Sequence, residues 1–364
     1  MTTGLNRTAI GARRPAVGVL TFHRCINYGS YWQARCLVEG LKNRGFDPLL
    51  LEHRSSRVNR KEWSTALCPT QARQTPEQRR LYHRKIELFL EAFESTLPLT
   101  PVFRLDEPPL AQEFTALVVG SDEVWNFRHP WYGAQPLVFG EARGVRRLIA
   151  YAASFGNHDA MDGLGGEWAE RLKRFAFLSV RDGNSQKLIA EALGDSPPVV
   201  LDPCLQFPST AQRRDTHSGE ILVYGHGFPH WFQDGVRAFA KAARAPIVSF
   251  GYHNDWADEQ RIAEGPEAFA RAMGAARAVV TNFFHGCVFA LINGRPFIAA
   301  PSDYRSNKVH DLLLRLGLQS CLMTPGSLPS DYGSALSAPP DPGAVLGLLR
   351  GTSDKFLDQS LAGL

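Results

Sequence analysis

The feature that most limits the fold of this chain is a repeated alternation of short β-branched runs with helical patterns. The runs AVGVLTF at 16–22 and ILVY at 221–224 are typical of buried strands, and each precedes apolar residues at helical spacing. Strands joined through such helices lie parallel in one sheet. The pattern therefore predicts an α/β protein built from doubly wound parallel sheets.

The length of the chain, 364 residues, indicates two domains, because a single hydrophobic core rarely grows beyond about 250–300 residues. A polar stretch that ends near residue 219 is typical of a linker. We expect one Rossmann-like domain over 1–207, a second over 208–330, and a tail over 331–364 that could pack back on the first. Segment 55–95 begins polar, irregular and basic, and we expect an insertion or lid there.

The composition of the chain restricts the classes of binding partner and the cellular compartment that we expect. The net charge of +4 is mild and spread out, which argues against a nucleic-acid partner but is compatible with anionic substrates or a lipid surface. Six cysteines lack metal-ligand or C-x-x-C spacing, so we expect thiols in a reducing compartment and no metal site. We found no signal-peptide core and no run of about 20 apolar residues. We therefore expect a cytoplasmic protein with at most peripheral contact at the inner face of a membrane.

Polar or glycine-containing turns follow four predicted strands of the first domain, the last of them at 199–202. The carboxyl ends of parallel strands share one rim of a sheet, and ligands bind outside that rim. We therefore expect these turns to converge. The turns are 120–122, 154–156, 181–182 and 202–203.

The second domain contains the most informative turn. Residues 277–294 read RAVVTNFFHGCVFALING, which predicts a strand, a turn and an apolar helix that begins near His285. Backbone N–H groups at such a helix start favour an anion, and Asn282 and Gly286 lie in the same turn. A histidine there could donate a proton to a bound phosphate or carboxylate substrate, or it could merely cap the turn.

Six short segments, taken in order, resemble the polysaccharide pyruvyl transferase family, and the resemblance spans about residues 17–318. It implies a GT-B-like fold, in which two Rossmann-like domains face a cleft. The segments are NYGSYWQA (27–34), VVGSDEVWN (118–126), IAYAASFG (149–156), LSVRD (178–182), VLDPCL (200–205) and FFHGCVFALINGRPF (283–297).

The resemblance also implies an activity. Phosphoenolpyruvate would be the donor substrate, with no cofactor, and its pyruvyl group would pass to a saccharide as a cyclic ketal in surface polysaccharide or glycoconjugate biosynthesis. The saccharide could be linked to a lipid. Two alternatives stay open: a GT-B glycosyltransferase that uses a nucleotide sugar, and a non-catalytic saccharide-binding relative.

The resemblance implies roles in the reaction for three residues. His285 would be the general acid or would hold the departing phosphate. Arg181 would bind the donor phosphate or carboxylate bidentately, although an ion pair with Asp182 is the structural alternative. Asp122 would take the proton of the attacking hydroxyl, or it could simply cap its turn.

Further residues of the expected cleft would contact the two substrates. Asn27 and Tyr28, at the start of the first helix, could supply hydrogen bonds and a stacking face to the acceptor, although a plain turn is equally credible. Trp125 could serve the same cleft or belong to the core. The remaining candidates are Asn126 on the acceptor side, and Asn282, Gly286, Gly225 and Gly227 on the donor side.

One departure from the family pattern concerns charge. Family members with established ketal-forming activity commonly carry arginine two residues before the histidine, whereas this chain has Phe283 and belongs to a subset with G-S-D and F-H-G patterns. A phenyl ring cannot bind a phosphate. Arg305 or Lys308, just after a predicted strand, could supply the missing cation, or both could be ordinary surface residues.

Overall fold

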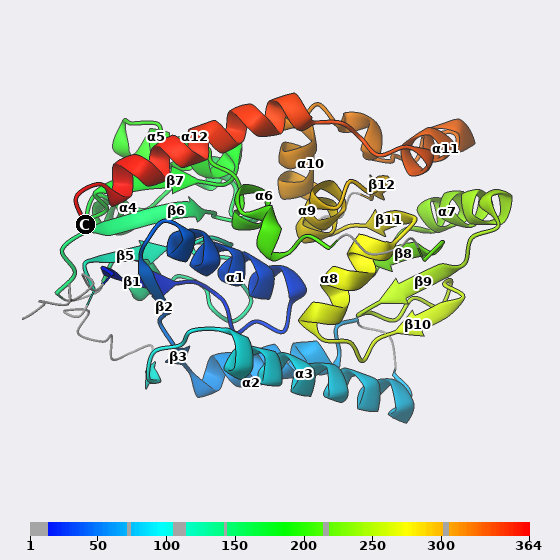
Figure 1. Cartoon of the computed structure of the whole chain (residues 1–364), viewed down its shortest axis with the longest axis horizontal. Helices are drawn as coiled ribbons and strands as arrows, with labels where there is room; N and C mark the ends of the chain where they lie inside the picture. Colours follow the sequence, from blue (N-terminus) through cyan, green and yellow to red (C-terminus); the bar gives the residue numbers. More distant parts are fainter. Residues whose placement is uncertain (1–13, 71–73, 105–113, 142–143, 214–217, 301–305) are drawn as a thin grey trace, which may run out of the picture.

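The computed structural model describes residues 14–70, 74–104, 114–141, 144–213, 218–300 and 306–364. Two five-stranded parallel sheets lie side by side, each covered by helices (Figure 1). This arrangement confirms the predicted fold class of two Rossmann-like units.

The first sheet has the strand order β2-β1-β5-β6-β7. The order reverses between β1 and β5, which is the point where open α/β sheets bind ligands. All four residues of β5 are buried, as expected for a central parallel strand. Its strands are β1 (Ala16–Leu20), β2 (Asp47–Leu50), β5 (Ala116–Val119), β6 (Leu148–Ala153) and β7 (Phe177–Val180), and its helices include α1 (Tyr28–Asn43), α4 (Gly166–Leu172) and α5 (Gly183–Leu193).

The second sheet has the order β10-β9-β8-β11-β12 and reverses between β8 and β11. The sequence predicted four of its strands, and the polar β10 was missed because it lacks an apolar run. Its strands are β8 (Ile221–Tyr224), β9 (Ile247–Phe250), β10 (Glu259–Arg261), β11 (Ala278–Thr281) and β12 (Phe297–Ala299), and its helices are α7 (His230–Ala243), α8 (Pro266–Ala275), α9 (Phe284–Ile292), α10 (Ser306–Arg315) and α11 (Pro329–Ser337).

The segment predicted as an insertion holds two helices, α2 (Ser56–Leu67) and α3 (Pro76–Thr96), beside a small β3–β4 pair (His53–Arg54 and Phe103–Arg104). Helix α3 agrees with the helix that the sequence predicts over 76–94. The expectation of irregular structure before residue 75 was wrong, because Ser55 caps α2 through the N–H of Val58. The two helices pack against each other along one edge of the molecule (Figure 1).

Helix α3 also contacts the second domain. The Tyr82 hydroxyl accepts a hydrogen bond from the N–H of His253 at 2.9 Å, and the Lys85 ammonium donates to the Gly251 carbonyl at 2.9 Å. The segment therefore connects the two sheets as well as covering the first.

The last helix, α12 (Gly343–Leu361), lies along the first domain (Figure 1). Its Ser353 hydroxyl accepts the N–H of Leu201 at 2.9 Å, and its Phe356 ring lies 6.3 Å from the ring of Tyr151. Within the described residues, no helix is long and apolar enough to cross a bilayer.

The predicted strand at 199–202 is absent as a regular strand. It consists of a single bridge between Val180 and Val199, after which Asp202 caps the short helix α6 (Pro203–Gln206). Prolines at both ends of the segment lack the N–H that would extend a strand ladder.

Candidate active site between the two domains

A cavity of about 370 Å³ lies at the reversal point of the first sheet, and α9 and α10 of the second domain contribute to its wall. We call it the interdomain cavity. Ten of its fifteen described lining residues are polar or charged, among apolar ones that contribute a similar share of its surface. The lining residues are Phe22, Cys25, Asn27, Ser30, Glu62, Thr65, Asp122, Glu123, His129, Pro130, Trp131, Arg181, Phe284, His285 and Lys308.

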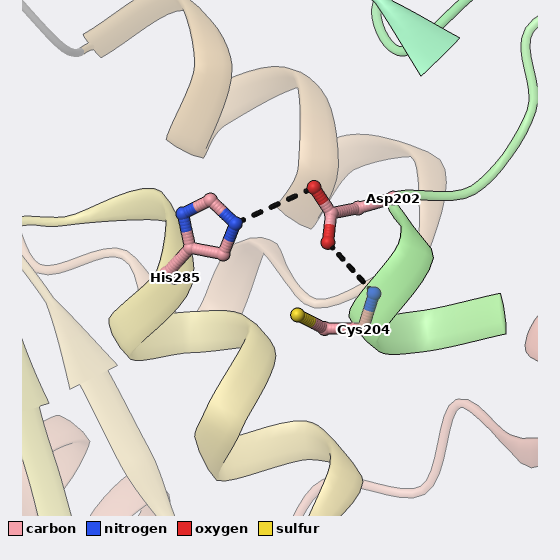
Figure 2. Close-up of side chains that lie close together, drawn as sticks. All are labelled: Asp202, Cys204 and His285. Carbon is pink, nitrogen blue, oxygen red and sulfur yellow. Dashed lines mark hydrogen bonds and ion pairs between the residues drawn. The ribbon is translucent and has the colours of Figure 1, made fainter. Parts of the chain in front are cut away.

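His285 lies in the first turn of α9 and is only 9% exposed. Its Nε2 lies 3.4 Å from the Oδ2 atom of Asp202, a charge contact without the alignment of a good hydrogen bond (Figure 2). On its other side the ring abuts α1, where a Cβ atom added to Gly29 would lie 2.1 Å from Nδ1. The imidazole is therefore held between a carboxylate and the backbone of the first domain.

Asp202 was missed as a site residue, although it stands in one of the six recognised segments. Its Oδ2 lies 3.0 Å from Nη1 of Arg181, and its Oδ1 accepts the N–H of Cys204. Burial acts to raise the pKa of Asp202, but the charges of His285 and Arg181 outweigh burial and hold it well below its usual range. An aspartate that directly precedes a helix-starting proline was the available signal.

Arg181 follows β7 and is 4% exposed. Its Nη2 lies 3.5 Å from Oδ1 of Asp122, and its guanidinium lies 4.5 Å from the centre of the Phe284 ring. Asp182, the partner considered in the sequence, instead caps α5. The arginine thus links two carboxylates at the cavity wall.

Asp122 both caps its turn and lines the cavity, so the two readings of this residue are compatible. Its Oδ1 accepts the N–H of Glu123, and its Oδ2 accepts the Ser30 hydroxyl at 2.8 Å. Its φ of 78° lies in the left-handed region, which costs roughly 1 kcal/mol for a non-glycine residue. Surrounding contacts must hold this strained backbone in place.

Lys308, on α10, lines the cavity and forms an ion pair with Glu123. Burial acts to raise the pKa of Glu123, but Lys308 and then Arg181 lower it to about 2. Arg305, the other cation considered, lies outside the described residues. The structure thus brings Lys308, Arg181 and His285 to one cavity.

Three of the four predicted acceptor residues are not among the residues that line this cavity. Tyr28 is fully buried, stacks on Phe269 at 4.4 Å and donates its hydroxyl to a carbonyl of the second domain. Trp125 is core and donates to a backbone carbonyl, and Asn126 donates to Glu123. Only Asn27 reaches the cavity, where it also caps α1.

Four of the predicted donor residues also lie elsewhere or act in packing. Asn282 donates to the His226 carbonyl, and its amide oxygen fills the place where a Cβ of Gly225 would lie. Gly286 makes room for Thr281, since a Cβ there would lie 2.1 Å from its hydroxyl. Gly227 lines a second cavity of about 660 Å³. None of the four is among the residues that line the interdomain cavity within the described chain.

Phe283 is directed away from His285 into an aromatic group of the second domain. Its ring lies 4.9 Å from that of Tyr224, 5.3 Å from Tyr252 and 5.6 Å from His226. Phe284, not Phe283, lines the interdomain cavity. The side chain of residue 283 therefore contacts a different set of residues from His285.

One described cluster has donor atoms close enough to be tested as a metal site. A carboxylate oxygen of Asp202, the thiol of Cys204 and a ring nitrogen of His285 lie within 4.8 Å of one another (Figure 2). However, Arg181 already neutralises Asp202, and burial followed by the nearby Cys36 raises the pKa of the Cys204 thiol well above its usual value. The three side chains are therefore better described as a histidine beside a charge-paired aspartate than as the ligands of a metal ion.

Comparison with known proteins was made at the level of families, curated proteins and solved structures. The family model described as polysaccharide pyruvyl transferase matches residues 27–304. No curated protein matches the sequence.

Among solved structures, a protein assigned as a UDP-N-acetylglucosamine 2-epimerase from Listeria monocytogenes has a TM-score of 0.52 at 11% identity, over 95% of this chain and 98% of that one. S. aureus MnaA with UDP gives 0.49 at 10% identity, over 97% and 98%. E. coli heptosyltransferase WaaC with ADP gives 0.40 at 13% identity, over 95% and 99%. The first of these likenesses supports the GT-B-like fold, and at this identity it says nothing of activity.

Proposed function

Because this chain belongs to the polysaccharide pyruvyl transferase family, we propose that it transfers the pyruvyl group of phosphoenolpyruvate to a saccharide as a ketal. Family membership makes the chain a transferase of polysaccharide biosynthesis. The donor, the ketal product and the residue roles are the content of the proposal.

The observation that carries the proposal is the gathering of Arg181, Lys308 and His285 in the interdomain cavity. Phosphoenolpyruvate carries a carboxylate and a phosphate, and buried cations bind such groups strongly through charge-assisted hydrogen bonds. Each lysine or arginine here already pairs with a carboxylate, so the donor would have to share or displace those partners. We expect the donor phosphate near Lys308 and the carboxylate near Arg181.

The proposed reaction begins with a proton transfer. Protonation of the donor's methylene carbon makes the adjacent carbon an oxocarbenium-like electrophile. One saccharide hydroxyl adds there, the bond to the phosphate oxygen breaks, and a second hydroxyl adds to close the ketal. One hydroxyl proton replaces the proton given to the methylene carbon, and the other leaves with inorganic phosphate, so the reaction balances.

In the proposed reaction His285 would give the first proton; its ring lines the cavity, and its Nε2 lies 3.4 Å from Oδ2 of Asp202. Asp202 would stabilise the charged imidazole before transfer. Asp122, 2.8 Å from the Ser30 hydroxyl, would accept the proton of the attacking saccharide. The proposed acid and base thus belong to different elements, His285 to α9 and Asp122 to the turn after β5.

The acceptor would approach past Asn27 and Ser30 at the start of α1, since both line the cavity. We propose a saccharide acceptor, carried on a lipid at the inner face of a membrane. No cofactor is needed, because phosphoenolpyruvate supplies both the transferred group and the leaving group.

Binding and turnover test the proposal separately. Titration calorimetry should show phosphoenolpyruvate binding to the wild type, much weaker binding to Arg181→Ala, and unchanged binding to the surface control Lys187→Ala. Phosphate release with a saccharide acceptor should disappear in His285→Ala. Stabilisation in a thermal-shift assay by nucleotide sugars but not by millimolar phosphoenolpyruvate would instead support a GT-B glycosyltransferase.

A further inference from the structure

Helix α2 presents a basic outer face. Arg57, Arg60, Lys61 and Ser64 follow one another at helical spacing, and all four are exposed. The one acidic residue of the helix, Glu62, points inward with Val58, and these two are its buried residues. The exposed side of α2 therefore carries three positive charges and no negative one.

These three cations have no ion-pair partner within the described residues, whereas two basic side chains of the neighbouring segments do. Arg54 pairs with Glu52, and Arg84 on α3 pairs with Glu87 and Glu91. Burial also raises the pKa of Glu62 to about 7, so much of its charge is lost near neutral pH. The local field of α2 is thus more positive than its sequence suggests.

Trp63 completes this face. It is 45% exposed, one of the few large apolar side chains on the surface of the described chain. On a helix of 3.6 residues per turn it lies next to Arg60 and away from the buried Val58 and Glu62. An exposed indole beside basic residues on one helix is typical of helices that lie in the headgroup region of a bilayer.

The basic outer face of α2 lies close to the interdomain cavity. Thr65 and Glu62 line the interdomain cavity from the inner side of the same helix. A surface bound by the outer side of α2 would therefore lie next to the cavity, within reach of a substrate anchored in that surface.

We propose that the outer face of α2, formed by Arg57, Arg60, Lys61 and Trp63, docks the protein on an anionic phospholipid membrane. The three cations meet the acidic headgroups, and the indole enters the interfacial layer. This inference does not depend on which donor the cavity binds, because it concerns only how the protein reaches its substrate.

Co-sedimentation tests the docking directly. The full chain should sediment with vesicles of phosphatidylcholine mixed with phosphatidylglycerol, but not with phosphatidylcholine alone, and added salt should weaken binding. The triple variant Arg57→Gln, Arg60→Gln, Lys61→Gln should bind about 100-fold more weakly, since each cation near an acidic surface contributes about fivefold. The control Lys187→Gln, Arg237→Gln, Lys241→Gln, with the same charge change on α5 and α7, should bind as the wild type does.

Quenching by brominated lipids gives a second readout that does not require the triple variant to fold. The wild type should lose tryptophan fluorescence on anionic brominated vesicles, and Trp63→Phe should lose much less. The proposal fails if the wild type does not sediment with anionic vesicles, if the control variant loses as much binding as the α2 variant, or if Trp63→Phe is quenched like the wild type.

Discussion

Gly29 and His285 are in direct contact, and a Cβ atom on the glycine would lie 2.1 Å from Nδ1 of the histidine. Gly29→Ala should therefore force the imidazole out of its present position beside Asp202. We expect kcat to fall by about 100-fold, the size of loss that a misplacement of about 1 Å can produce, with little change in helix stability. The matched control is Gly333→Ala on α11, where an added Cβ meets nothing within 4 Å. Equal turnover in the two variants would show that the contact does not position the histidine.

Asp202→Asn removes a charge while keeping a side chain that can still cap α6. The imidazole loses its counter-ion and Arg181 loses a competing carboxylate. We expect kcat for phosphate release to fall by about 10- to 100-fold, while the dissociation constant of phosphoenolpyruvate stays equal or decreases. The control is Asp159→Asn, which caps a 3₁₀ helix elsewhere. A rise in the dissociation constant with unchanged kcat would contradict the assignment.

Glu62→Gln should change how stability depends on pH. Burial raises the pKa of Glu62 to about 7 from 4.5, so between those values the folded state holds a proton that the unfolded state has released. Stability is therefore lost as pH rises through this window, and the penalty is complete above about pH 7. Glutamine keeps an acceptor for the N–H of Ile26, which lies 2.7 Å from Oε1 of Glu62.

Urea unfolding should show the variant more stable than the wild type by about 2–3 kcal/mol near pH 8 and not more stable near pH 4. Glu94→Gln, an exposed position on α3, should show no such pH-dependent gain. A gain of the same size at both pH values would mean that the change is not electrostatic.

Lys85→Met addresses the contact between α3 and the second domain. Burial lowers the pKa of Lys85 to about 7 from 10.5, so the unfolded state binds the proton more tightly and the wild type gains stability as pH rises between these values. The rings of Tyr28 and Tyr252, 4.8 and 4.3 Å from the ammonium, offset part of the cost of the charge.

We expect the methionine variant to be more stable by about 2 kcal/mol near pH 6, and the gain to vanish near pH 10, where the wild-type lysine is neutral and still donates to Gly251. Thermal unfolding across this pH range measures the difference. A variant that is less stable at pH 6 would show that the hydrogen bond and the ring contacts outweigh the burial of the charge.

The sequence predicted most of the architecture because parallel strands and their helices leave a strong local pattern. The bounds of β8 agree with the predicted range, and α9 starts where the apolar pattern predicted. Helix α2 was not predicted, because most of its residues are polar and only two of those described, Val58 and Glu62, are buried. The direction of side chains was harder to predict. Tyr28 and Trp125 lie within two residues of cavity residues along the chain, yet both are buried in the core.

The candidate site was partly predictable for the same reason. Asp122, Arg181 and His285 follow strands, and strand ends converge on the rim of a sheet. The pairing of His285 with Asp202 could not be read from spacing, because the two residues belong to different structural units and meet only through tertiary packing. A resemblance to a family can indicate which residues belong to the site, but it does not predict which of them are in contact.

The ion pair between Glu123 and Lys308 joins the turn after a first-domain strand to a helix of the second domain, and the contact of Asp202 with His285 joins the start of α6 to α9. Separating the domains would leave Lys308 and His285 without these carboxylates, while Asp202 would keep its ion pair with Arg181. An anionic substrate that bound Lys308 and His285, as we propose, would compete with Glu123 and Asp202 for these two side chains. Substrate binding and contact between the domains would then depend on the same cations, and one bridge made by the ligand would replace two made by the protein.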